Sequence, residues 1–177
     1  MGFIFSLNTK SLLNYRIEAY WTYEICHGYH VKQFHEDRDG KVVKLQEYFL
    51  GKWNELKTEK LNKELEEKKS SNDYKMRTVK IENMNFPYLE IDMTDGTFCD
   101  LNNAPRTIKI KYVCFPNKNS EIYSIKETST CNYEMIILTS KLCLLPAFST
   151  NKNEETMIQC SPSDDSQKMP YGYIVSS

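Results

Sequence analysis

Two segments in the second half of the chain alternate between apolar and polar residues, and this period of two constrains the fold more than any other feature. They read TIKIKYVCF over residues 107–115 and CNYEMIIL over residues 131–138. Successive side chains of an extended strand point to opposite faces. The first segment therefore predicts a strand that places Ile108, Ile110, Tyr112 and Cys114 on one face. The second predicts the same for Cys131, Tyr133, Met135 and Ile137.

Other segments have the composition of strands, and turn residues rather than helices separate them. They cover residues 20–25, 30–34, 42–51 and 86–93, with Gly28, Asp39-Gly40 and Asp95-Gly96 in the connections. A succession of strands without a helix between each pair favours antiparallel pairing. We therefore predict a mainly β protein, a flattened antiparallel β-barrel or sandwich.

One segment departs from this pattern. Residues 53–71 read WNELKTEKLNKELEEKKSS, with Trp53, Leu56, Leu61 and Leu65 as a thin apolar stripe among Glu and Lys. We predict a charged helical insertion whose polar face is solvated; the alternative is a docking helix for a partner protein. Residues 149–177 are polar and aperiodic and predict a flexible tail.

Charge and cysteine content narrow the function and the compartment. The net charge of -1 gives no footprint for nucleic acid or an anionic membrane. The six cysteines form no C-x-x-C pair, which favours disulfides and an oxidising compartment over structural zinc. No segment is long and apolar enough to predict insertion into a membrane. Residues 1–14 lack the apolar length of a secretory signal, so we interpret them as an atypical, truncated N-terminus.

Residues 20–35, YWTYEICHGYHVKQFH, combine aromatic side chains with one cysteine, three histidines and a glutamine, and they predict a hairpin that carries a site. A metal cluster of Cys26, His27, His30 and His35 is one interpretation. Strand alternation argues against it, because His30 and His35 would point to opposite faces. We expect no metal and no cofactor.

The motifs YWTYEICHG, HVKQFHED, EYFLG, TFCDLNNAPR, SIKETSTCNYE and KLC occur in this order along the chain. Their order resembles that of mannose-6-phosphate-receptor-homology (MRH) lectin domains. The resemblance implies a P-type lectin-like fold, and we expect the domain to cover residues 15–148.

In this family a glutamine, an arginine, a glutamate and a tyrosine bind mannose. The matching positions are Gln33, Arg106, Glu127 and Tyr133. Asp100 falls on a position that lines the pocket in some members. Tyr20 and Trp21 occupy the place of an aromatic pair that packs on the glycan.

These residue types also suit a hexose on chemical grounds alone. Vicinal hydroxyls donate and accept, so they need a carboxylate acceptor, a forked donor and groups that do both. We expect Arg106 beside Glu127, where each would offset the cost of desolvating the other. Binding of a single sugar should be weak, and several contacts would raise the affinity.

The resemblance also implies the disulfide pairing. It pairs Cys99 with Cys131 and Cys114 with Cys143, which would clamp the loops that carry Arg106 and Glu127. Cys26 lacks its usual upstream partner. Three readings stay open: a missing N-terminus, a bond to Cys160, or a free thiol.

The implied function is a lectin that binds mannose-rich N-glycans on misfolded glycoproteins in the endoplasmic reticulum lumen. Its expected partners are these glycans and an endoplasmic reticulum membrane ubiquitin-ligase complex with its lumenal adaptor, in the pathway of endoplasmic-reticulum-associated degradation. A glycosidase that uses Asp100 and Glu127 is disfavoured, because Arg106 would keep Glu127 ionised. The main alternative is an adaptor with the same fold that binds proteins and little or no glycan.

Overall fold

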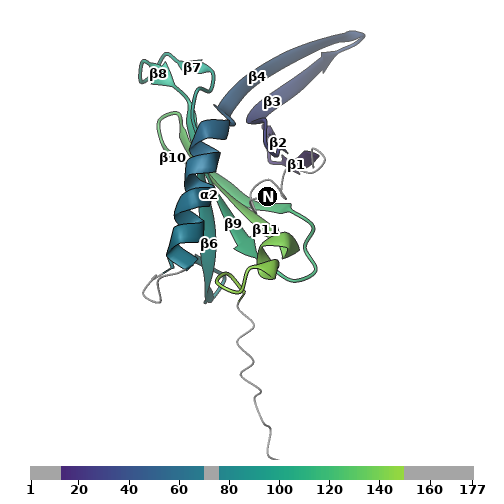
Figure 1. The fold of residues 1–177 in the computed structure, drawn as a ribbon. Helices are drawn as coiled ribbons and strands as arrows, with labels where there is room; N and C mark the ends of the chain where they lie inside the picture. The colour runs from purple at the N-terminus through teal and green to yellow at the C-terminus, as the bar shows by residue number, and fades with distance from the viewer. Residues whose placement is uncertain (1–12, 70–75, 150–177) are drawn as a thin grey trace, which may run out of the picture.

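The computed structural model describes residues 13–69 and 76–149. Most of them lie in strands that form two larger sheets and one small ribbon (Figure 1). The elements are β1 (Leu13–Ile17), β2 (Thr22–Cys26), β3 (His30–Asp39), β4 (Val42–Lys52), α2 (Glu55–Lys69), β5 (Thr78–Ile81), β6 (Met84–Met93), β7 (Phe98–Cys99), β8 (Ala104–Pro105), β9 (Thr107–Cys114), β10 (Glu121–Ser129), β11 (Asn132–Thr139) and the 3-10 helix η1 (Ser140–Leu144).

The first sheet contains four antiparallel strands in the order β1-β2-β3-β4. Gly28 and Gly40 lie in its two tight turns with φ of 81° and 60°, a region that glycine enters without steric cost. The long β3–β4 hairpin extends away from the rest of the molecule (Figure 1). Its outer half, from residue 36 to residue 47, is exposed.

The second sheet has the order β10-β11-β9-β6-β5. Its pairs are antiparallel with one exception, since β9 and β11 run parallel. This pair differs from the antiparallel succession predicted from the sequence. The intervening β10 pairs with the far side of β11, so the chain reverses twice between the two neighbours. A bulge between Ile122 and Ser124 interrupts the alternation of β10, and this segment carries little strand signal in the sequence.

The two sheets pack face to face around the larger of two apolar clusters, as the alternation predicted. The first sheet contributes Ile25, Val31 and Leu50, and the second contributes the predicted inward rows of β9 and β11. Burial of one such side chain stabilises the fold by roughly 1.5–3 kcal/mol. The sheets approach closely at Gly51, where an added Cβ would lie 2.7 Å from the Cβ of Met93.

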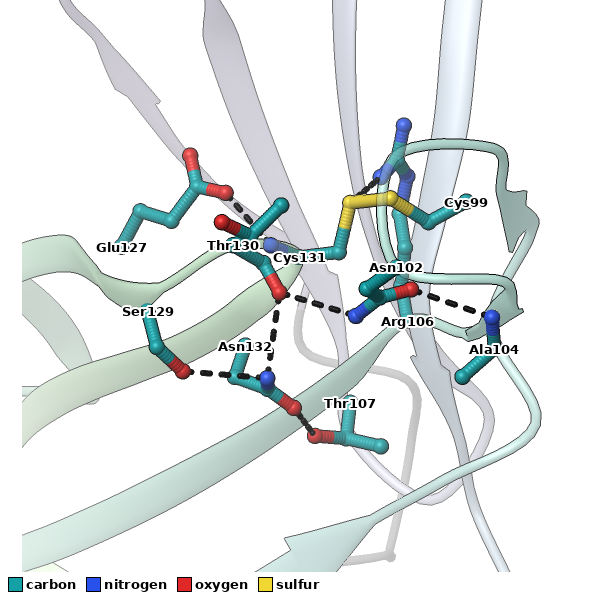
Figure 2. Close-up of a disulfide and its surroundings, with 10 residues drawn as sticks. All are labelled: Cys99, Asn102, Ala104, Arg106, Thr107, Glu127, Ser129, Thr130, Cys131 and Asn132. Atoms are coloured by element: carbon teal, nitrogen blue, oxygen red, sulfur yellow. Dashed lines mark hydrogen bonds between the residues drawn. A yellow bond between two sulfur atoms is a disulfide. The ribbon is translucent and has the colours of Figure 1, made fainter.

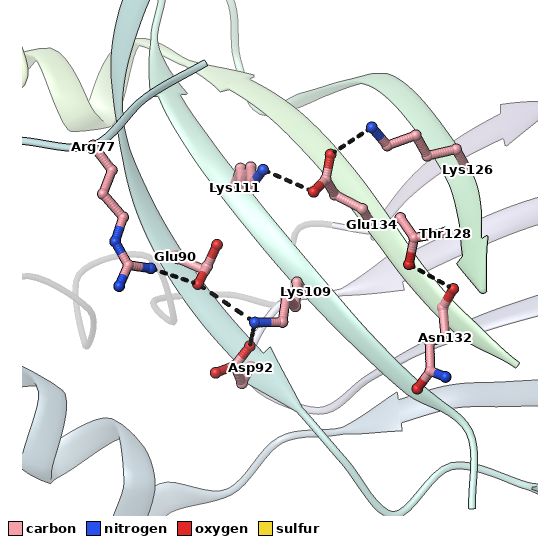
Figure 3. Close-up of polar contacts among 9 residues, drawn as sticks. All are labelled: Arg77, Glu90, Asp92, Lys109, Lys111, Lys126, Thr128, Asn132 and Glu134. Carbon is pink, nitrogen blue, oxygen red and sulfur yellow. Dashed lines mark hydrogen bonds and ion pairs between the residues drawn. The ribbon is translucent and has the colours of Figure 1, made fainter.

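Part of the outer face of the second sheet is covered by ion pairs rather than by another layer (Figure 3). Glu134 accepts from Lys111 at 2.7 Å and pairs with Lys126 at 3.0 Å. Burial acts to raise the pKa of Glu134, but the hydrogen bonds from both lysines outweigh it and hold this pKa below its ordinary value. Lys109 similarly pairs with Glu90 and Asp92. This part of the face meets water, whereas Phe86, Val113 and Ile136 belong to a second, smaller apolar cluster on the same face.

The charged segment between β4 and β5 is the helix α2, which agrees with the predicted helical character of residues 53–71. The side chain of Asn54 caps it by accepting from the backbone N–H of Lys57 at 3.0 Å. Trp53 and Leu61 pack against the core. In the part of the chain that the structure describes, no helix has both the length and the apolar composition needed to cross a bilayer. The predicted tail from residue 150 and the atypical N-terminus up to residue 12 lie outside the described residues.

Candidate functional site

The candidate site begins on the inner face of the first sheet, just beyond the core. Gln33 of β3 lies between Tyr23 of β2 and Tyr48 of β4 in the strand register. Directly opposed side chains on one face of a sheet are in contact range. Gln33 is only 6% exposed although its amide is polar. The sheet therefore fixes this amide between two aromatic rings.

Arg106 enters the site from the other side, at the residue between β8 and β9. Its guanidinium carbon lies 4.6 Å from the centroid of the Tyr48 ring. Its Nη1 is placed against the Sγ of Cys131. Its Nε is buried and has no hydrogen-bond partner among the described residues. A buried donor without a partner is costly, and because protein atoms enclose Nε, the Nη groups are the donors left for a ligand.

Glu127 and Tyr133 come from the β10–β11 pair, where they are direct cross-strand partners. The Oε1 of Glu127 accepts the backbone N–H of Cys131 at 2.6 Å, and the side chain is exposed. Tyr133 is 7% exposed. Burial raises the pKa of Tyr133, and the negative charge of Glu127 raises it further while Arg106 opposes this. Tyr133 thus keeps its proton at neutral pH and can both donate and accept.

Tyr23 connects the two halves of the site. Burial raises the pKa of its hydroxyl, and the charges of Glu18, Tyr133 and Glu127 raise it further. Tyr23 also packs against the apolar cluster that contains Tyr133, so its hydroxyl lies near β10 and β11. The four predicted ligands from four separate motifs are therefore brought into one cluster, and Tyr23 and Tyr48 join them.

A single disulfide, Cys99–Cys131, organises the loops that bear Arg106 and Glu127 (Figure 2). Both of these side chains contact Cys131, as described above. Next to the disulfide, Asn102 donates to the carbonyl of Thr130 at 2.9 Å and accepts the N–H of Ala104 at 3.0 Å. The loops are thus cross-linked by one covalent bond and by hydrogen bonds, which limits how far the site can relax.

The same turn is tied to β9 by a second set of bonds. Asn132 donates to Ser129 and to the carbonyl of Thr130, both at 3.1 Å. Its Oδ1 accepts from the hydroxyl of Thr107 at 2.7 Å. Cys131 itself adopts a φ of 62°, which this network holds in place.

One expected contact is absent. Arg106 and Glu127 form no ion pair, although the sequence analysis placed them side by side to neutralise each other. Their link runs through Cys131 instead, since the guanidinium meets its sulfur and the carboxylate meets its backbone N–H. The second oxygen of Glu127 and most guanidinium donors consequently stay available for a ligand.

Tyr20 and Trp21 lie next to this cluster. The ring of Tyr20 stacks on His35 with 3.8 Å between ring centroids, and it meets Trp21 edge to face at 5.0 Å. Trp21 in turn meets the ring of Tyr48 at 5.9 Å. This aromatic group therefore extends the site toward the β3–β4 hairpin.

Asp100 is the predicted site residue that lies outside this cluster. It is exposed after Cys99, in the loop between β7 and β8. Within the described residues it makes no hydrogen bond or ion pair with the other six predicted residues. Its place is at the rim of the loop that carries the disulfide.

The histidines of the hairpin point to separate partners. His27 lies 2.9 Å from the Tyr112 hydroxyl, and His30 lies 3.0 Å from Glu24. The Nδ1 of His35 lies 2.7 Å from the carbonyl oxygen of Tyr20. Nowhere in residues 13–69 and 76–149 do three or more potential ligands gather as a metal site would require.

The remaining cysteines fall into two groups. Cys114 and Cys143 form the second disulfide and join β9 to η1. Among the described residues Cys26 forms no disulfide, and burial and the charge of Glu24 raise the pKa of its thiol. Cys160 lies outside the described residues, so the structure leaves the pairing of Cys26 with it untested.

Comparison with known proteins places this arrangement in a family. A model of the glucosidase II beta subunit-like protein family matches residues 13–99. Endoplasmic reticulum lectin 1 of Homo sapiens is 41% identical over 155 residues, which are 85% of this chain and 32% of that protein. The protein OS-9 homolog of Arabidopsis thaliana is 32% identical over 147 residues, which are 83% of this chain and 47% of that protein.

A solved structure matches the fold as well. The solution structure of the MRH domain of Yos9, complexed with α3,α6-Man5, superimposes with a TM-score of 0.55 at 23% identity, covering 85% of this chain and 86% of that one. The chain belongs to the MRH domain family. This MRH chain spans about a third of the length of the endoplasmic reticulum lectin that it matches.

Tyr23 and Tyr48 are members of the site that were not predicted from the sequence. Both are aromatic residues of predicted strands, and an aromatic strand residue is more often part of the core than of a site. The signal that identifies them is the cross-strand register with Gln33, which links segments 10 and 15 residues away along the chain. Only the paired sheet reveals that neighbourhood.

Proposed function

We propose that this MRH domain is a lectin that binds mannose-containing N-glycans on misfolded glycoproteins. The single observation that carries the proposal is the convergence of Gln33, Arg106, Glu127 and Tyr133 about the side chains of Tyr23 and Tyr48. One relative is named an endoplasmic reticulum lectin, and the MRH domain of Yos9 was solved with a mannose oligosaccharide.

Each side chain takes a distinct part in recognising a hexose. Arg106 donates to two neighbouring hydroxyl oxygens through the Nη groups of its planar fork. Glu127 accepts a hydroxyl proton through the oxygen that Cys131 does not use. Gln33 and Tyr133 each donate and accept. Such a set selects vicinal hydroxyls with a fixed geometry.

A longer glycan gains further contacts at the edge of the site. The group formed by Tyr20, Trp21 and His35 offers apolar ring faces and edges to the CH face of a neighbouring sugar. Asp100 at the rim can accept from an outer hydroxyl. Binding of one sugar stays weak because water competes for every hydroxyl, and these additional contacts raise the affinity of a branched oligosaccharide.

The proposed cellular role is quality control in the endoplasmic reticulum lumen. The two disulfides suit an oxidising compartment, and the name of the human relative supports this location. There the domain would deliver glycoproteins to a membrane ubiquitin-ligase complex and its lumenal adaptor for degradation. Binding would occur without turnover, because one oxygen of Glu127 is engaged by the backbone N–H of Cys131 and is not free to act as a general acid.

Titration of the full chain with the mannopentaose α3,α6-Man5 tests the proposal, with Arg106→Ala as the site variant. We expect saturable binding by the wild type and a loss of about 2 kcal/mol, roughly 30-fold, in the variant. Arg77→Ala is the matched control, since Arg77 pairs with Glu90 on the outer face of the second sheet. Absence of saturable binding by the wild type would favour the adaptor alternative.

A further inference from the structure

Tyr48 makes several contacts that have no part in the glycan recognition proposed for this site. It is half-buried on β4, directly opposite Gln33 of β3. On its other side the Arg106 guanidinium lies over the ring, with 4.6 Å from the guanidinium carbon to the ring centroid. The ring thus touches two of the four proposed ligands, which come from different sheets.

The Tyr48 ring restricts the movement of the Arg106 guanidinium on one of its two faces. An aromatic face attracts a cation and stacks well on a planar guanidinium. The sulfur of Cys131 meets Nη1. The ring and the disulfide therefore hold Arg106 between them, and these contacts use few of its N–H donors. Its remaining N–H groups keep their direction while staying free.

Tyr48 is itself fixed by neighbours. The amide of Gln46 donates to the Tyr48 hydroxyl at 3.1 Å, and the same amide accepts from the Tyr20 hydroxyl at 3.3 Å. The edge of Trp21 approaches the ring at 5.9 Å. A ring held in this way has few orientations, so it can set the orientation of a neighbour.

We propose that Tyr48 is the positioning residue that holds the Arg106 guanidinium in its binding orientation, through its ring rather than its hydroxyl. This inference rests on the proposed lectin function. It gives β4 a role in sugar recognition although this strand supplies none of the proposed sugar contacts. Tyr48 acts on the sugar only through Arg106.

Binding of α3,α6-Man5 to the full chain separates the ring from the hydroxyl. Tyr48→Leu should weaken binding at least about tenfold, whereas Tyr48→Phe should stay within about twofold of the wild type. Tyr88→Leu is the matched control, because Lys111 lies over the Tyr88 ring at 4.9 Å on the outer face of the other sheet. Wild-type affinity in Tyr48→Leu would overturn the proposal. So would a large loss in Tyr48→Phe, since the hydroxyl would then carry the effect.

A second measurement without sugar distinguishes failure of this inference from failure of the lectin proposal. In the NMR spectrum of the free protein, the ring current of Tyr48 should shift the Arg106 Nε–H signal upfield. The shift should persist in Tyr48→Phe and vanish in Tyr48→Leu, while the remaining spectrum stays that of a folded protein. An Arg106 signal unaffected by Tyr48→Leu would refute the positioning role, whether or not the wild type binds the glycan.

Discussion

His27 shows at the scale of one residue how the β2–β3 turn depends on pH. Its side chain is 3% exposed, and its Nδ1 lies 2.9 Å from the buried hydroxyl of Tyr112. Burial, with a smaller effect from the charge of Lys141, lowers the pKa of His27 to about 4. No metal is expected at this histidine from the sequence, and in the structure His27 lies at the packing of the two sheets.

The lowered pKa predicts a loss of stability in acid. The unfolded chain binds a proton at His27 as the pH falls through about 6.5, but the folded protein does so only near 4. The neutral His27 side chain therefore contributes its full stabilisation of the fold above pH 6.5. This stabilisation is lost progressively between about pH 6.5 and 4, and the total loss reaches roughly 3 kcal/mol. Urea unfolding at pH 7 and pH 4 measures it.

The variant His27→Gln should lose less stability than the wild type over this range, because it cannot take up the proton. His35→Gln is the control, since His35 lies at the surface of the hairpin beside Tyr20. Equal losses in the wild type and in His27→Gln would contradict this account of the buried imidazole.

At the scale of elements, alternation along the chain was enough to predict the inward rows of β9 and β11 and the strands around Gly28 and Gly40. It was not enough to predict that β9 and β11 pair in parallel, because pairing depends on where β10 lies in space. The same limit applies to the site. Family motifs identify Gln33 and Arg106, but the contacts of Tyr48 follow from register and packing between distant segments.

The two disulfides offer a matched comparison between elements. They close loops of similar length, with sequence separations of 32 and 29, so removal of either should cost a similar stability of about 3–4 kcal/mol. Only Cys99–Cys131 contacts Arg106 and Glu127. We therefore expect the double variant Cys99→Ser/Cys131→Ser to lose α3,α6-Man5 binding well beyond its loss of stability.

The variant Cys114→Ser/Cys143→Ser is the control, because that disulfide joins β9 to η1 away from the site. The comparison uses calorimetric titration at a temperature at which thermal melts show that both variants are folded. Equal loss of binding in the two double variants would mean that the Cys99–Cys131 disulfide has no special role in holding the site.

At the scale of the whole molecule, the inner face of the first sheet runs from the core to the site without a break. Ile25, Val31 and Leu50 pack against the second sheet, and Tyr23, Gln33 and Tyr48 follow on the same face. The distance between the sheets therefore affects both stability and the geometry of the site. Gly51 is one point where they approach closely.

Gly51→Ala should force the sheets apart, because the new Cβ would meet Met93 at 2.7 Å and Ile108 at 2.9 Å. We expect a destabilisation of about 1–3 kcal/mol in urea unfolding. Gly40→Ala is the comparison, since nothing lies within 4 Å there and only its φ of 60° is unfavourable, at a cost of about 1 kcal/mol. A wild-type stability for Gly51→Ala would contradict close packing at this point.

We propose that a mannose glycan binds where the two sheets bring Gln33, Arg106, Glu127 and Tyr133 together. This can be tested by mapping NMR chemical-shift changes in the full chain during titration with α3,α6-Man5. We expect saturable changes at these four residues and at Tyr48, with none along the ion pairs of the outer face in Figure 3. Saturable changes centred on that outer face, or no saturable change at the four residues, would contradict it.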